Sequence, residues 1–260
     1  MTYTDIKYRV TNGRAEIVLD RPDVLNAYTQ ETLVELNMAL EDAIDDDAVY
    51  AIVLTGSGNG FCSGKDVSAG NEPSYRMEKV DRLGKVASAM RHLYTGPKPT
   101  IAAVNGPAVG GGMELALSCD FRVLSEDAFF RDAHARLGAT PATGGAWILP
   151  RLIGEARAKR AVLLGEDITA TEAQELGMAI DVVPGDECLD AAREIASTLR
   201  DFPATALRES KRLVDPTVQS FDEHAHAVLD SRWKCEQDPE SSEAATALRE
   251  GREPAFDREY

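Results

Sequence analysis

Three consecutive glycines, at positions 110 to 112, separate a short apolar run from a segment with helical periodicity. The run Ile101–Val104 predicts a buried strand, and Asn105-Gly106-Pro107 predicts a turn. Because glycine lacks a Cβ atom, a ligand can approach the backbone closely at such a junction. The first N–H groups of a helix lack intrahelical partners and attract negative charge. The pattern predicts a site for an anion or a developing oxyanion, with tight helix packing as the alternative reason for the glycines.

The charge of the chain limits its possible partners. Lys and Arg total 28 against 44 Asp and Glu, which gives a formal net charge of -16. This surplus repels nucleic acid and anionic lipid surfaces, so a phosphate-bearing ligand would need a local basic patch. No window approaches the roughly 20 apolar residues of a membrane helix, and Met1–Asp5 do not begin a signal peptide. We predict a cytoplasmic protein without a nucleic-acid or membrane partner.

The cysteines and histidines do not form a metal or disulfide pattern. The four cysteines are far apart in the sequence, which favours reduced packing residues over a disulfide framework or a zinc site. Cys62 lies in a glycine-rich segment, where a reactive thiol is the alternative to a packing residue. His224 and His226 lack the spacing of ligands on one helical face, so no metal is expected.

Hydrophobic periodicity predicts mixed α and β structure, of the α/β or α+β class. The expected elements are, in chain order, a hairpin over 6–20, a helix over 30–44 capped by Thr29, a strand over 50–55, a surface helix over 75–93, a strand pair over 121–124 and 128–130, and helices over 146–153, 156–164 and 171–176. No proline-rich or Ser/Gly-rich linker divides the chain. We therefore predict one main body over 1–200 with a helical C-terminal region over 201–260.

Two further glycine-rich segments flank the triplet in the chain. Gly58–Val67 follows the strand predicted over 50–55, and Gly138–Gly145 leads into Leu149-Pro150-Arg151-Leu152-Ile153-Gly154. In this order and spacing, nearly the whole chain resembles the enoyl-CoA hydratase/isomerase (crotonase) superfamily. The resemblance implies an α/β fold, a ββα superhelix (spiral) with a helical C-terminal trimerisation region. It also implies an acyl-CoA substrate, no cofactor beyond the coenzyme A of that substrate, and self-association as a trimer or a dimer of trimers.

The resemblance assigns candidate residues to the site. The backbone amides of Lys65 and Gly111 correspond to the two halves of the family's oxyanion hole. The family pattern has alanine where this chain has Lys65, but the chemistry needs only the amide. The further residues expected at the substrate are Asp66, Val67, Ser68, Gly110 and Gly138, with Lys211 near the phosphates.

Two side chains are candidates for proton transfer. Glu114 follows Gly111 by three residues, where the hydratases carry a glutamate that activates water; a carboxylate favoured by the helix dipole is the alternative. The family's second glutamate is replaced by His134, whose ordinary pKa of ~6.5 suits acid or base work. A facing Glu114 would favour the imidazolium and apolar burial would oppose it, so the direction of the pKa shift stays open. Asp132 could orient His134 only if a turn brings them together; a hydrogen-bonded wall residue is the alternative role for the histidine.

The resemblance therefore implies an enoyl-CoA hydratase, which adds water across the 2,3 double bond through an enolate stabilised by the oxyanion hole. His134 at the second carboxylate position keeps two related reactions open, namely isomerisation of an enoyl-CoA and hydrolysis of a β-keto or hydroxyacyl-CoA. A noncatalytic acyl-CoA-binding member of the fold is an alternative of a different class.

Overall fold

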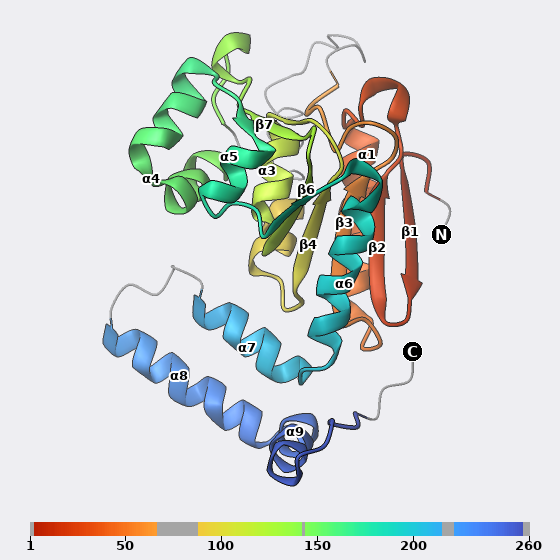
Figure 1. The fold of residues 1–260 in the computed structure, drawn as a ribbon, viewed down its shortest axis with the longest axis vertical. Coiled ribbons are helices and arrows are strands. Elements are labelled where there is room, and N and C mark those ends of the chain that lie inside the picture. Colours follow the sequence, from red (N-terminus) through yellow and green to blue (C-terminus); the bar gives the residue numbers. More distant parts are fainter. Residues whose placement is uncertain (1–2, 67–87, 142–143, 215–220, 257–260) are drawn as a thin grey trace.

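The computed structural model describes residues 3–66, 88–141, 144–214 and 221–256, without the side chains of 221–226 (Figure 1). Its main sheet has six strands in the order β1-β2-β3-β4-β6-β9. β1 (Ile6–Thr11) and β2 (Arg14–Leu19) form the predicted hairpin, and Asn12 and Gly13 both have positive φ, as a tight hairpin turn requires. The described part of the chain contains no helix that is long and apolar enough to cross a membrane.

The other strands of the main sheet are parallel to β2. They are β3 (Ala51–Gly56), β4 (Thr100–Val104), β6 (Phe121–Ser125) and β9 (Asp181–Val183), and in the centre Val53 pairs with Ile101 and Ile101 with Phe121. Every residue of β3 and β4 is buried. Parallel strands covered on both faces read as continuous apolar runs, which explains the sequence of these two strands.

A second sheet has three short strands in the order β5-β7-β8: β5 (Ala108–Val109), β7 (Phe129–Arg131) and β8 (Ile168–Thr169). The predicted pairing of the strands near 121–124 and 128–130 is wrong, because β6 and β7 belong to different sheets. Both edges of β6 are already occupied, by β4 and by β9. The turn after Ser125 therefore carries the chain into the second sheet.

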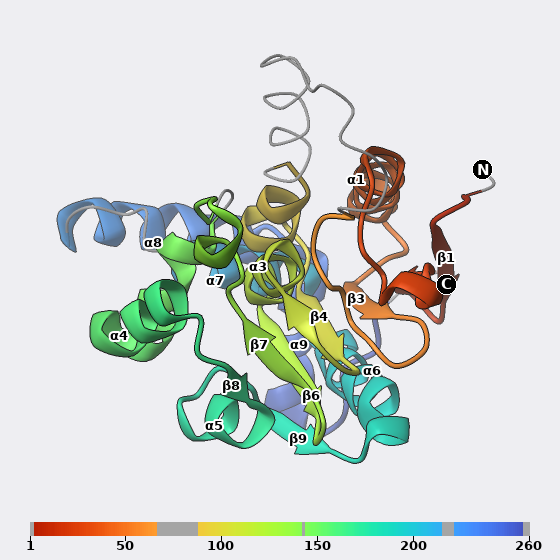
Figure 2. The same cartoon turned by 90° about the horizontal axis from the view of Figure 1, so that it is seen from above.

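Helices cover both faces of the main sheet. Figure 2 shows α1 (Gln30–Asp45) and α3 (Gly111–Ser118) on one side and α6 (Cys188–Arg200) on the other. Alternate residues of β3 serve the two layers, since Ile52 and Leu54 lie in the core with α1 and α3, whereas Val53 packs with Ala192 of α6. The Thr29 cap of α1 is confirmed, with a hydrogen bond from the Thr32 N–H.

Two predicted helices merge into one element. α4 (Gly145–Leu164) runs through both predicted ranges with a kink at Gly154, whose φ is 74°. α5 (Ala170–Glu175) begins at the predicted Thr169 cap, and the short 3-10 turns are η1 (Pro22–Val24), η2 (Ala135–Leu137) and η3 (Gly185–Glu187). Most of the helix predicted over 75–93 lies outside the described residues, which show a helix over 88–95.

The chain ends in a helical arm of α7 (Ala204–Val214), α8 (Phe221–Glu236) and α9 (Pro239–Glu250), at one end of the sheet core (Figure 1). Its helices contact one another, and Lys211 joins α7 to the core. The arm exposes the large apolar side chains of Val214, Leu229, Trp233 and Leu248. These exposed side chains distinguish the arm from the core helices α1 and α3.

Candidate functional site

The loop after β3 lies against the start of α3. Val109 donates its N–H to the Cys62 carbonyl at 2.9 Å, and a Cβ atom on Gly64 would lie 3.5 Å from the Gly111 nitrogen. On the other side of the loop, Tyr28 donates its N–H to the Gly64 carbonyl and accepts from the Asp66 N–H. In a trans peptide the N–H points opposite to the C=O, so the Lys65 N–H points away from the Tyr28 backbone. The structure thus brings the Gly64–Lys65 peptide beside the Gly111 amide.

The glycine triplet has a packing role as well. Gly110 has a φ of 54°, which lies in the left-handed region. A Cβ atom on Gly111 would lie 2.2 Å from the Tyr28 hydroxyl, and one on Gly112 would lie 2.0 Å from the Cys62 carbonyl oxygen. The alternative explanation by tight packing is therefore correct for these two glycines. It is compatible with ligand binding, since Gly111 begins α3 and its N–H has no intrahelical acceptor.

Glu114 is buried in the first turn of α3, with 1% of its surface exposed. Its Oε1 accepts the N–H of Gly145 at 2.9 Å, at the start of α4. A Cβ atom on Gly145 would lie 2.8 Å from the Glu114 Cγ, so only glycine fits without moving the carboxylate. This partner is not predicted from the sequence, although the pair Gly144-Gly145 in the third glycine-rich segment is a signal for it.

His134 lies across Gly110 from the start of α3. A Cβ atom on Gly110 would lie 3.7 Å from the His134 Cε1 and 3.9 Å from its Nε2. The other ring nitrogen, Nδ1, lies 3.0 Å from Oδ1 of Asp132, which is buried. The same Oδ1 accepts the His134 backbone N–H at 2.9 Å. The turn before η2 thus provides the contact that the sequence left open.

The direction of the His134 pKa shift follows from these contacts. The hydrogen bond to Asp132 raises the pKa of His134 above its ordinary value, burial acts in the opposite direction, and the negative charges of Asp132 and Glu114 add to the rise. Asp132 contacts the ring directly, and Glu114 acts on it through its charge. The site therefore favours the imidazolium more than water does.

The remaining predicted residues around the substrate differ in their placement. Asp66 is buried, and its carboxylate lies 2.9 Å from Nη1 of Arg21, an ion pair that ties the loop to the segment before α1. Gly138 ends η2 with a φ of 67° and is exposed, with open space around a Cβ position. Val67 and Ser68 lie outside the described residues.

The structure shows intramolecular partners for Lys211, which is predicted near the phosphates. Its ammonium donates to the carbonyls of Leu93 at 2.9 Å and Lys98 at 3.0 Å, and it lies 2.8 Å from the Asp120 carboxylate. Asp120 follows the C-terminal end of α3, whereas Glu114 and Gly111 lie at its N-terminal end. Three acceptors surround a group with three N–H donors. Lys211 therefore holds α7 against the core, and its place near the phosphates stays a prediction.

The described residues also show the surroundings of the cysteine thiols. Burial raises the pKa of the Cys62 thiol to about 12, so it packs beside the site without being a reactive thiolate. All four cysteines are free. Among the residues with described placement, no group of three or more His, Cys, Asp or Glu side chains could hold a metal ion.

Comparisons with known proteins identify the family. A family model described as enoyl-CoA hydratase/isomerase matches residues 9–259. A probable enoyl-CoA hydratase of Rhodobacter capsulatus is 36% identical over 258 residues, covering 98% of this chain and 99% of the relative. A crotonyl-CoA hydratase of Syntrophomonas wolfei is 33% identical over 259 residues, with 98% and 99% coverage.

A solved structure confirms the predicted crotonase-like fold. The crystal structure of an enoyl-CoA hydratase from Bacillus anthracis superposes with a TM-score of 0.92 at 30% identity, covering 98% of this chain and 100% of that one. The match extends through the sheets and the C-terminal helices. The chain is an enzyme that belongs to the enoyl-CoA hydratase/isomerase family.

Proposed function

We propose that the protein adds water across the 2,3 double bond of an enoyl-CoA thioester. The thioester oxygen would lie between the amides of Lys65 and Gly111, which stabilise the enolate as it forms. One such donor contributes ~3 kcal/mol to the stability of a transition state. The proposal needs no cofactor beyond the coenzyme A that the substrate itself carries.

Glu114 and His134 would divide the proton transfers. Glu114 takes a proton from water as the water oxygen bonds to Cβ, and the π electrons of the double bond move into the enolate. His134 then gives a proton to Cα, and the enzyme resets when a proton passes from Glu114 to His134 directly or through solvent. Support for this division comes from the turn at Gly110: the Glu114 N–H donates to the Gly110 carbonyl, the His134 ring lies against Gly110, and the charge of Glu114 acts on His134.

Crotonyl-CoA hydration tests the proposal, followed by the loss of conjugated absorbance. We expect turnover by the wild type and a loss of roughly 10²- to 10⁴-fold in kcat for Glu114→Gln, because the amide cannot accept the proton. Glu155→Gln is the matched control, since Glu155 lies exposed on α4 and pairs with Lys159. It should keep full activity.

Other outcomes would separate the alternatives. Turnover of crotonyl-CoA by Glu114→Gln at the wild-type rate would remove the role of Glu114. Shift of a double bond, or release of the coenzyme A thiol from a β-keto or hydroxyacyl-CoA, without hydration would replace the proposal by isomerisation or hydrolysis. Binding of acyl-CoA without turnover of any of these thioesters would leave a noncatalytic binding protein.

We also propose that the helical region over 201–260 mediates self-association as a trimer or a dimer of trimers, while 1–200 forms the catalytic core. Support comes from the helical arm, where Trp233 is 62% exposed and Val214 and Leu248 are each 82% exposed. Analytical ultracentrifugation of the full chain tests this proposal. A monomer at micromolar concentration would contradict it. The predicted cytoplasmic location stays a prediction.

A further inference from the structure

Asp132 is the carboxylate that contacts the His134 ring. Its side chain is fully buried. One carboxylate oxygen, Oδ1, accepts a hydrogen bond from the backbone N–H of His134 and lies 3.0 Å from Nδ1 of the ring. Within the described part of the chain, the other oxygen, Oδ2, has no hydrogen-bond partner. Both contacts of the Asp132 carboxylate are with His134, so its main effect is on that residue.

We propose that Asp132 is a positioning residue that keeps His134 in the Nδ1–H tautomer and presents Nε2 to the substrate. The tautomer follows from the geometry and does not depend on the reaction. Its consequence for turnover rests on the hydration proposed above.

The chemistry of the two groups supports this assignment. An ionised carboxylate only accepts hydrogen bonds, so the ring nitrogen beside it must carry the proton. The bond from the His134 backbone N–H to the same oxygen fixes the turn, and the Nδ1 contact fixes the rotation of the ring. Nε2 is then the atom that exchanges a proton with the substrate, on the edge that faces Gly110. A flipped ring would lose the Asp132 contact.

Nitrogen NMR of the imidazole rings tests the tautomer directly. The chain has four histidines, and the His134 signals are those that disappear in His134→Gln. We expect the neutral ring of the wild type to carry its proton on Nδ1 and to titrate at a higher pH than the ring in Asp132→Ala. Asp132→Ala should also populate the Nε2–H form. A wild-type ring protonated on Nε2 would overturn the proposal, as would a tautomer and titration that Asp132→Ala leaves unchanged.

Kinetics then separate positioning from a merely structural role. If His134 acts as an acid, kcat for crotonyl-CoA falls as pH rises through its pKa. Asp132→Asn, which keeps the shape but removes the charge, should move this limb to lower pH and reduce kcat by roughly 10²-fold, with KM nearly unchanged. Asp127→Asn is the matched control on the exposed turn between β6 and β7, and it should leave rate and limb unchanged.

The two proposals fail in different ways. An Nδ1–H ring together with no hydration of crotonyl-CoA supports the Asp132 assignment and overturns the proposed reaction. If the wild type hydrates crotonyl-CoA but the fall of kcat with pH occurs at the same pH in Asp132→Asn, only the Asp132 assignment is overturned. If Asp132→Ala does not fold, the wild-type spectrum and Asp132→Asn still decide the assignment.

Discussion

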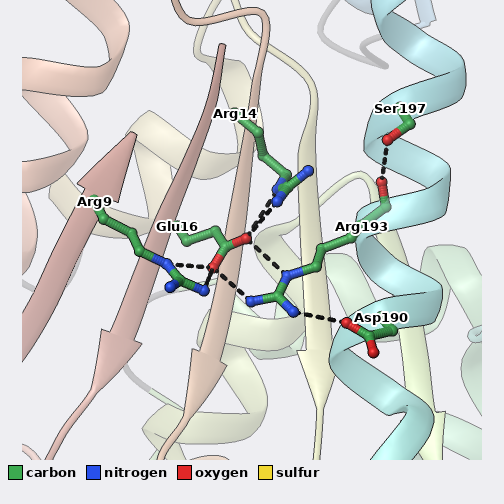
Figure 3. A network of polar contacts seen from close by, with 6 residues as sticks. All are labelled: Arg9, Arg14, Glu16, Asp190, Arg193 and Ser197. Atoms are coloured by element: carbon green, nitrogen blue, oxygen red, sulfur yellow. Dashed lines mark hydrogen bonds and ion pairs between the residues drawn. The ribbon is translucent and has the colours of Figure 1, made fainter. Parts of the chain in front are cut away.

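Two buried carboxylates in this molecule have opposite surroundings. Glu16 and Asp132 are each 1% exposed. Glu16 accepts hydrogen bonds from three guanidinium groups, those of Arg9, Arg14 and Arg193, as Figure 3 shows. Asp132 faces one imidazole. Arginine keeps its charge at any working pH, whereas an imidazole gains and loses a proton near neutrality, so only the second arrangement suits proton transfer.

The Glu16 network is a structural connection. Burial opposes ionisation of Glu16, but the hydrogen bonds from Arg193, Arg9 and Arg14 outweigh it and lower its pKa to about 2. The three arginines come from β1, β2 and α6, so the network ties the hairpin to the helix that covers the sheet (Figure 3). Asp190 adds a further contact to Arg193 at 2.6 Å.

Glu16→Gln should give the largest change in stability. Removal of the carboxylate leaves Arg14 without its ionic partner and Arg193 with Asp190 alone, and breaking a buried pair costs roughly 3–5 kcal/mol. Urea unfolding measures the loss, while kcat for crotonyl-CoA in the folded variant should stay at the wild-type value. If Glu16→Gln keeps the wild-type stability, or loses turnover without losing stability, then Glu16 does not have the structural role that distinguishes it from Asp132.

The stabilisation by Glu16 should also depend on pH. Because the pKa of Glu16 is lowered on folding, its stabilisation is complete above the unfolded value of ~4.3 and is lost as pH falls toward about 2. The full contribution is roughly 3 kcal/mol. The difference in unfolding free energy between wild type and Glu16→Gln should therefore narrow between about pH 5 and about pH 3. A constant difference over this interval would show that Glu16 is not held in its ionised form by the arginines.

Arg9→Gln should give the smallest effect. The Arg9 side chain is 59% exposed, and Glu16 keeps Arg14 and Arg193 when Arg9 is removed. Exposed ion pairs contribute about 0–1 kcal/mol, so the unfolding free energy should change by no more than that. Arg14→Gln is the control, because that side chain is 11% exposed and should cost more. Equal losses of unfolding free energy in Arg9→Gln and Arg14→Gln would mean that burial does not determine how much each contact stabilises the protein.

Local patterns in the sequence predict much of the site. The glycine triplet predicts the start of α3, and one helical turn is enough to relate Glu114 to Gly111. The resemblance to the hydratases identifies His134 as the departure from a second carboxylate. It does not decide whether Asp132 meets His134, since residues two apart meet only when the chain turns between them, as it does before η2.

The sequence by itself determined the α/β class, the glycine-rich loops, the order of the candidate residues and the family. Only the tertiary structure decided which side chains are partners across long separations. Gly145 meets Glu114 from 31 positions away, Arg193 meets Glu16 from 177, and Lys211 reaches Leu93 from 118. The physical reason is that hydrophobic periodicity indicates which side of a helix or strand faces the core. An ion pair or a buried hydrogen bond depends in addition on how two such elements pack against each other.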